Sequence, residues 1–115
     1  MTRLDPSALH ILPRHLEMVK NLLRQFLPDA EVWAYGSRVT GKNHEASDLD
    51  LVVRNPENPQ VEIPSVAALK EAFTESDLPI RVDVVEWARV PETFHRTIEE
   101  KHVVVQEFAI RSSPG

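Results

Sequence analysis

The spacing of hydrophobic residues predicts that the chain begins with helical structure. From His15 to Leu27 the apolar side chains recur with the period of an amphipathic helix, and Pro28 ends the pattern. Pro13 interrupts the earlier residues, so we expect a separate short helical turn there. Asp5 and Pro6 form a suitable N-cap and first-turn pair for that turn.

The remaining pattern alternates between short β-rich runs and helical segments. The proline-rich stretch Asn55–Pro64 reads as a loop. This order predicts an α/β (α+β) domain in which a small mixed β-sheet is flanked by helices. The expected strands are Val32–Tyr35, Leu49–Val53, Ile80–Val85 and a short last strand, His102–Gln106; the expected helices are a short one after Gly36, one from about Ser65 to Ser76, and one opening at Pro91 with Phe94 and Ile98 facing inward.

Length and composition indicate one ordinary globular domain. The chain has 115 residues, 42% of them hydrophobic and 27% charged, and we assign residues 1–110 to the domain and 111–115 to a disordered tail. The sequence contains no cysteine, no signal-peptide pattern and no apolar run of membrane-spanning length, so a cytoplasmic protein is expected. The net charge of −5 argues against direct nucleic-acid binding.

Two aspartates at the head of a predicted strand are the first candidates for chemistry. Side chains alternate along a strand, so Asp48 and Asp50 should project to the same side while Leu49 and Leu51 point into the core. Two neighbouring carboxylates repel each other unless a cation lies between them or both face water. Ligands that are all oxygen atoms suit Mg²⁺, which typically takes one or two carboxylates together with phosphates.

The glycine–serine step before these aspartates is typical of phosphate binding. Gly36 directly follows a strand and precedes a short helix, so backbone N–H groups and the Ser37 hydroxyl can approach a phosphate closely. Alone this step is a weak signal, but followed by Ser47-Asp48-Leu49-Asp50 it is strong. Arg38 either contacts a phosphate or is a solvated loop charge, and the sequence favours neither.

These two motifs resemble the signature of the nucleotidyltransferase superfamily that includes DNA polymerase beta. The likeness runs from about Leu4 to Phe108 and is greatest to the minimal prokaryotic members. It implies a polymerase-beta-like fold in which the motif residues and a third carboxylate act together. The implied nucleotide-binding residues are Gly36, Ser37, Arg38 and Ser47, and the implied catalytic and metal-binding residues are Asp48, Asp50 and, on a neighbouring strand, Asp83.

The resemblance also implies a partner and a reaction. Minimal members are similar to antitoxins encoded beside an all-helical HEPN-type toxin, and some transfer AMP from ATP onto a tyrosine of that toxin. We therefore expect a Mg²⁺-dependent adenylyltransferase with ATP and a HEPN-type toxin as its partners. Two alternatives stay open: a catalytically weak or inactive antitoxin that neutralises its partner by binding, and a nucleotidyltransferase of small molecules such as antibiotics, which the short chain disfavours.

Other readings of individual residues also remain open. For Asp83 the alternative is an exposed strand residue paired with Arg81 or Arg54. Glu86 competes as third carboxylate, although it falls on the opposite strand face. The histidines, His44, His95 and His102, lack metal-ligand spacing and are interpreted as surface residues. We expect Trp33 and Trp87 to pack in the core or at an edge, and Val103–Phe108 to offer a strand edge to a partner.

Overall fold

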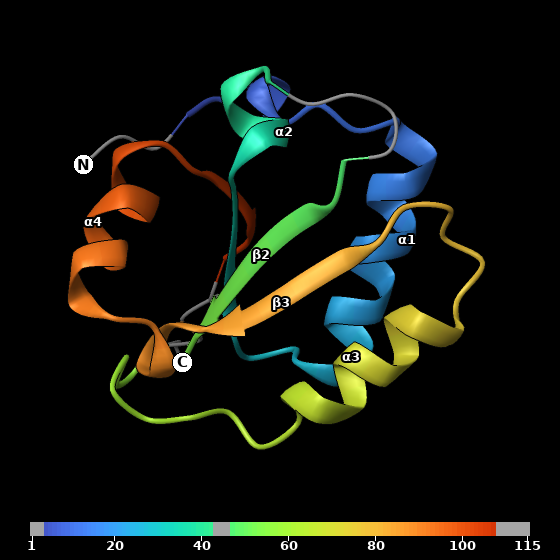
Figure 1. The fold of residues 1–115 in the computed structure, drawn as a ribbon. Helices are drawn as coiled ribbons and strands as arrows, with labels where there is room; N and C mark the ends of the chain where they lie inside the picture. The colour runs from blue at the N-terminus through green and yellow to red at the C-terminus, as the bar shows by residue number, and fades with distance from the viewer. Residues whose placement is uncertain (1–3, 43–46, 108–115) are drawn as a thin grey trace, which may run out of the picture.

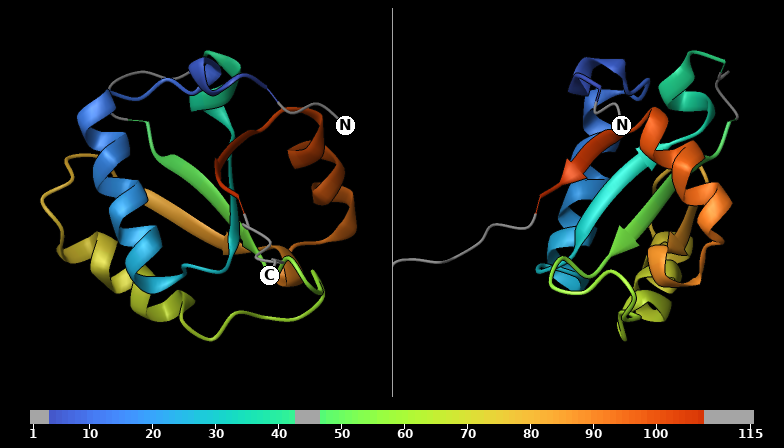
Figure 2. Two further views of the ribbon diagram at one scale, coloured as in Figure 1. Left: turned by 180° about the vertical axis from the view of Figure 1, so that it is seen from behind. Right: turned by 90° about the vertical axis from the view of Figure 1, so that its left-hand side faces the viewer.

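A four-stranded mixed β-sheet separates two layers of helices. The computed structural model describes residues 4–42 and 47–107. Figure 1 shows α1 and α3 on one side of the sheet and α4 on the other, and Figure 2 shows α4 lying over the sheet from a second direction. The helices are α1 (Pro13–Phe26), α2 (Ser37–Thr40), α3 (Val66–Glu75) and α4 (Glu92–Glu100), with 3₁₀ turns η1 (Pro6–Ala8) and η2 (Trp87–Arg89); the strands are β1 (Glu31–Tyr35), β2 (Leu49–Arg54), β3 (Val82–Glu86) and β4 (Val103–Gln106).

The strand order is β3-β2-β1-β4. Strand β1 runs antiparallel to both β2 and β4, whereas β2 and β3 are parallel. The predicted small mixed sheet flanked by helices is therefore confirmed. Strand β3 forms one edge of the sheet and β4 forms the other. β4 covers Val103–Gln106 of the segment expected to offer a strand edge, and Phe108 lies outside the described residues.

The sheet face covered by α1 and α3 holds the larger core. Leu49, Leu51 and Val53 alternate along β2 and have no exposed surface, as the period-two pattern predicts. Val19 and Leu23 of α1 meet them and are equally buried. Burial of one such side chain stabilises the fold by roughly 1.5–3 kcal/mol, so this face anchors β2 and leaves the alternate residues of the strand to the opposite face.

The face beneath α4 is built from aromatic rings. Trp33 and Trp87 meet edge to face with centroids 5.4 Å apart, which confirms that both are packing residues. His102 stacks on Trp33 at 4.1 Å, and His95 stacks on Trp87 at 3.8 Å. The interpretation of His102 as a surface residue is wrong, because it is only 3% exposed. His95 is partly exposed, and its Nε2 lies 2.8 Å from the Trp87 carbonyl oxygen. His44 lies outside the described residues.

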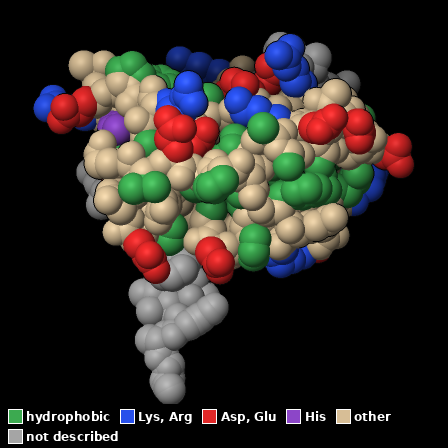
Figure 3. Space-filling view, turned by 90° about the horizontal axis from the view of Figure 1, so that it is seen from below, with side chains coloured by type: hydrophobic (Ala, Val, Ile, Leu, Met, Phe, Trp, Pro, Cys, Tyr) green, Lys and Arg blue, Asp and Glu red, His purple; other side chains and the backbone are tan. Residues whose placement is uncertain are grey.

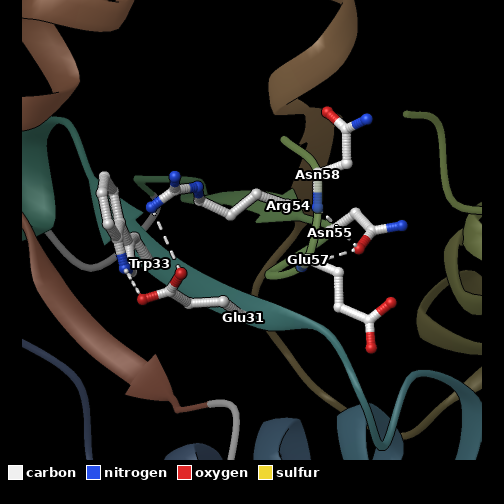
Figure 4. Close-up of polar contacts among 6 residues, drawn as sticks. All are labelled: Glu31, Trp33, Arg54, Asn55, Glu57 and Asn58. Atoms are coloured by element: carbon white, nitrogen blue, oxygen red, sulfur yellow. Dashed lines mark hydrogen bonds and ion pairs between the residues drawn. The ribbon is translucent and has the colours of Figure 1, made fainter. Parts of the chain in front are cut away.

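An arginine completes this aromatic layer at the end of β2. The Arg54 guanidinium lies 4.8 Å from the Trp33 ring centroid and 4.9 Å from that of Trp87. Its Nη1 donates to Glu31 Oε1 at 3.2 Å, and Trp33 Nε1 donates to the other Glu31 oxygen at 3.1 Å (Figure 4). The pairing of Arg54 with Asp83 is therefore wrong, because Arg54 is held by Glu31. Asp83 itself is exposed, as that alternative expected.

The segment between β2 and α3 is a loop, as its prolines predict. The Asn55 carboxamide oxygen accepts hydrogen bonds from the backbone N–H groups of Glu57 and Asn58 at 3.0 and 3.3 Å (Figure 4). Further along, the Ile63 N–H donates to a Glu86 carboxylate oxygen at 2.9 Å. The loop is thus closed on itself at one end and attached to β3 at the other.

Several element boundaries differ from the prediction. Helix α1 starts at Pro13 itself, because proline lacks only an N–H that a first-turn residue does not need. Strand β3 starts at Val82, two residues after Ile80, and continues to Glu86. Phe94 was expected to face inward but is 38% exposed, although its ring packs edge to face against Tyr35 of the interior strand β1. The expected tail, residues 111–115, lies outside the described residues.

The surface carries charges of both signs. The face seen from below Figure 1 mixes acidic, basic and hydrophobic side chains without one large area of a single sign (Figure 3). Within residues 4–42 and 47–107, every helix is too short or too polar to cross a membrane.

Candidate active site

Two of the predicted carboxylates lie side by side on the face beneath α4. Asp50 and Asp83 are register partners across the parallel β2–β3 pair, so their side chains leave the same face of strands about 4.8 Å apart. Their neighbours Leu49 and Val84 point to the opposite core. Glu86 is on that opposite face as well, where it binds the Ile63 N–H, so the competing third carboxylate lies away from this pair.

Asp48 lies just before β2 and is exposed. Its negative charge is close enough to Asp50 to help raise the pKa of that carboxyl group. Within the described parts of the chain, no three acidic or histidine side chains are gathered closely enough to enclose a metal ion. The arrangement is a close carboxylate pair with a third acid at its margin, which leaves coordination positions for phosphate oxygens and water.

The electrostatics of Asp50 reflect burial and like charge. Burial, followed by the negative charges of Asp83 and Asp48, raises the pKa of Asp50 from 3.8 to about 6. Tyr35, the register partner of Asp50 on β1, is affected in the same way: burial and then the charges of Asp50 and Asp83 raise its pKa to about 12. The Tyr35 phenol is therefore a neutral neighbour of the carboxylate pair, a feature that the sequence alone did not reveal.

The glycine–serine step lies directly against this pair. Gly36 is the N-cap residue of α2 and has φ 84° and ψ −155°, a conformation that is open essentially only to glycine. A Cβ atom at Gly36 would collide with the Asp50 carboxylate. Ser37 is the first residue of α2. The structure therefore brings the predicted phosphate-binding step into contact with the predicted metal ligand.

The Arg38 side chain is buried and donates hydrogen bonds to backbone carbonyl groups. It is 6% exposed, so the solvated-charge alternative is wrong. Its Nε donates to the Ser47 carbonyl oxygen at 3.1 Å, and its Nη1 donates to the His10 carbonyl oxygen at 2.7 Å. The guanidinium thus ties α2 to the segment that leads into β2. Ser47, a predicted nucleotide contact, is positioned by this bond next to Asp48.

The donor set fits a hard divalent cation. Asp50 and Asp83 offer only oxygen atoms, and the raised pKa of Asp50 reflects burial and then like-charge repulsion, both of which a bound cation would offset. Magnesium prefers carboxylate and phosphate oxygens of this kind. The geometry therefore brings the predicted phosphate-binding turn, Gly36 and Ser37, next to a carboxylate pair.

The stability of the metal-free protein should depend on pH through Asp50. A raised pKa means that the folded state favours the protonated acid, so this stabilisation is complete below pH 3.8 and is lost as the pH rises through about 6. We expect Asp50→Asn to melt above the wild type at pH 7.5 and the difference to shrink as the pH falls from 7 to 4.5. Thermal melts in chelator across this range measure it; a difference that does not change with pH would contradict the shift.

A glycine–serine turn against paired carboxylates on a small mixed sheet is the arrangement expected of a phosphoryl-transfer enzyme. The sequence matches the nucleotidyltransferase domain family over residues 16–105, so the chain belongs to that family and is a nucleotidyltransferase. Enzymes of this family generally use a divalent metal, in agreement with the donor set.

Two known proteins are similar over most of the chain. The probable protein adenylyltransferase MntA of Haemophilus influenzae is 46% identical over 101 residues, which cover 88% of this chain and 87% of that protein. A crystal structure of a toxin–antitoxin with AMP-PNP has the same fold, with a TM-score of 0.62 at 20% identity, and the match covers 83% of this chain and 73% of that one. The predicted nucleotidyltransferase fold is thus confirmed.

Proposed function

We propose that this nucleotidyltransferase transfers AMP from ATP to a tyrosine hydroxyl of a HEPN-type toxin encoded nearby, and so acts as the antitoxin. The observation that carries the proposal is the contact of the Gly36 turn with Asp50, which is itself paired with Asp83. The similarity to a protein named as an adenylyltransferase supports AMP as the transferred group. The fold shared with a toxin–antitoxin supports the role of antitoxin.

In this reaction some residues of the chain would bind the nucleotide and the metal ion, and one would accept a proton. Gly36 and Ser37 would hold the triphosphate through backbone N–H groups and a hydroxyl. Asp48, Asp50 and Asp83 would hold Mg²⁺, which supplies charge neutralisation at the triphosphate and a lowered pKa of the attacking hydroxyl. The tyrosine oxygen forms a bond to the α-phosphorus of ATP. The bond between the α-phosphorus and the oxygen that bridges it to the β-phosphorus breaks, and pyrophosphate leaves. Asp83 accepts the phenolic proton.

A labelled-ATP assay tests this function. Wild-type protein mixed with the toxin from the adjacent reading frame, ATP and Mg²⁺ should incorporate labelled AMP into the toxin, and chelator should stop it. The double variant Asp48→Asn plus Asp50→Asn should lose this incorporation, because its metal ligands have lost their charge. Incorporation at the wild-type level in the double variant would refute the site. A stable complex without any incorporation would instead favour an antitoxin that acts by binding.

A further inference from the structure

Phe94 is unusual in being an exposed aromatic residue close to the carboxylate pair. It lies in the first turn of α4 and is 38% exposed. Its ring meets Tyr35 edge to face, with centroids 5.7 Å apart and planes at 81°. Tyr35 is the register partner of Asp50, so Tyr35 links Phe94 to the carboxylate pair.

A cavity of about 590 Å³ adjoins Phe94 and extends along β3. Val85, Val90 and Pro91 supply apolar surface, Lys70 and Arg89 supply positive charge, and Glu86 supplies negative charge. Arg89 is already paired with Glu62 at 3.6 Å. Val85 is two residues beyond Asp83 on the same face of the strand, so the cavity lies about 7 Å along β3 from that carboxylate. The cavity is therefore of mixed polarity and adjoins the strand that carries Asp83.

The edge of β3 is open next to this cavity. Among the described residues β3 pairs only with β2, and Figure 1 shows it as the front strand, with α4 on one side and α3 on the other. Its outward backbone N–H and C=O groups are thus free to bind an extended segment of another chain. A cavity that offers both apolar and charged side chains beside an open strand edge is a combination suited to a polypeptide.

The strand order separates this surface from the phosphate-binding turn. Gly36 and Ser37 follow β1, whereas the cavity lies at β3, so the carboxylates of Asp50 and Asp83 stand between them. A triphosphate at the Gly36 turn would leave the β3 side as the open approach to Asp83. The other sheet edge, β4, lies beyond β1 and is remote from Asp83.

We propose that the β3 edge and the cavity beside Phe94 form the docking surface for the acceptor protein. The occupant is an extended segment of the toxin that carries the acceptor tyrosine, with an apolar side chain against Phe94 and an acidic residue facing Lys70. This inference rests on the proposed function, which supplies the acceptor. Lys70 has no ion pair among the described residues, so its charge is available for such a contact.

Steady-state kinetics with the toxin as acceptor test the surface. Removal of an exposed aromatic anchor typically weakens binding about tenfold or more, so Phe94→Ala should raise the KM for the toxin by that factor while the KM for ATP stays within about twofold of the wild type. Leu12→Ala is the matched control, because Leu12 is 49% exposed but lies at the start of α1. It should change neither constant.

A charge variant and a binding measurement make the outcome decisive. Lys70→Glu, at an exposed position, should raise the KM for the toxin more at low than at high ionic strength, because salt screens such contacts. An unchanged KM in both variants, with an active wild type, would overturn the docking surface and leave the proposed function intact. If the wild type transfers no AMP, that function fails, and titration of the toxin onto each protein then decides: weaker binding by Phe94→Ala supports the surface, and equal binding overturns it.

Discussion

Asp50→Asn is expected to melt at the same temperature as the wild type or higher in chelator, and to lose most of the stabilisation by ATP and Mg²⁺. Burial and the charges of Asp83 and Asp48 disfavour the ionised form of Asp50. Removal of this charge therefore stabilises the folded protein when no metal is bound. A ligand at a hundred times its Kd adds about 2.7 kcal/mol, which for a domain of this size is a shift of roughly 10 °C. The wild type should gain this shift in thermal melts, and the variant should not.

Asp29→Asn provides the matched control for charge removal. Asp29 is exposed and precedes β1, at the opposite end of that strand from Tyr35 and Gly36. This variant should melt like the wild type and show the full response to ATP and Mg²⁺. Equal ligand shifts in the Asp50 variant and the wild type would count against a metal site at the carboxylate pair.

Gly36→Ala should lower both stability and activity. The backbone conformation of Gly36 costs about 1–3 kcal/mol for a residue with a side chain, and the added methyl group would displace the Asp50 carboxylate. We expect a melting temperature lower by roughly 5–10 °C. We also expect AMP transfer to fall by about 100-fold, the order of loss that a misplaced reactive group produces. Thermal melts and the labelled-ATP assay measure the two effects.

Gly41→Ala separates backbone strain from the collision with Asp50. Gly41 has the same φ of 84°, but a Cβ atom there meets only His10 Cε1 at 3.8 Å, an ordinary contact. The Gly41→Ala variant should be less stable than the wild type, because alanine is disfavoured in the left-handed conformation of this position. It should retain AMP transfer. Similar activity in the two glycine variants would show that the contact between Gly36 and Asp50 does not matter for the reaction.

The sequence predicted the features that depend on neighbouring residues. Leu49, Leu51 and Val53 could be assigned to the core because strand alternation is local. The same rule correctly set Glu86 on the opposite face from Asp83. Neither the hydrophobic pattern nor the residue spacing predicted that Asp50 and Asp83 lie together. That prediction came from the family resemblance, and the parallel register of β2 and β3 provides its structural basis.

The features that escaped prediction depend on contacts between distant segments. Arg38 is buried because a carbonyl group 28 residues away accepts its hydrogen bond, and His102 is buried because Trp33, on another strand, offers a ring to stack on. Helical periodicity correctly turned Ile98 inward. It failed for Phe94 in the first turn of α4, because the period of one helix sets the direction of a side chain and not how completely other elements cover it.

The parallel pairing of β2 with β3 has a consequence for the order of events during synthesis. Parallel neighbours cannot be joined by a tight turn, and here the chain crosses over through α3 before β3 returns beside β2. Asp50 and Asp83 therefore meet only after this long crossover has closed, which is among the slower steps in the folding of a small domain. A nascent chain that has emerged only as far as α3 already contains the glycine turn and the first two aspartates but lacks the strand that brings Asp83 to them. The carboxylate pair is thus completed late, after most of the polypeptide has left the ribosome.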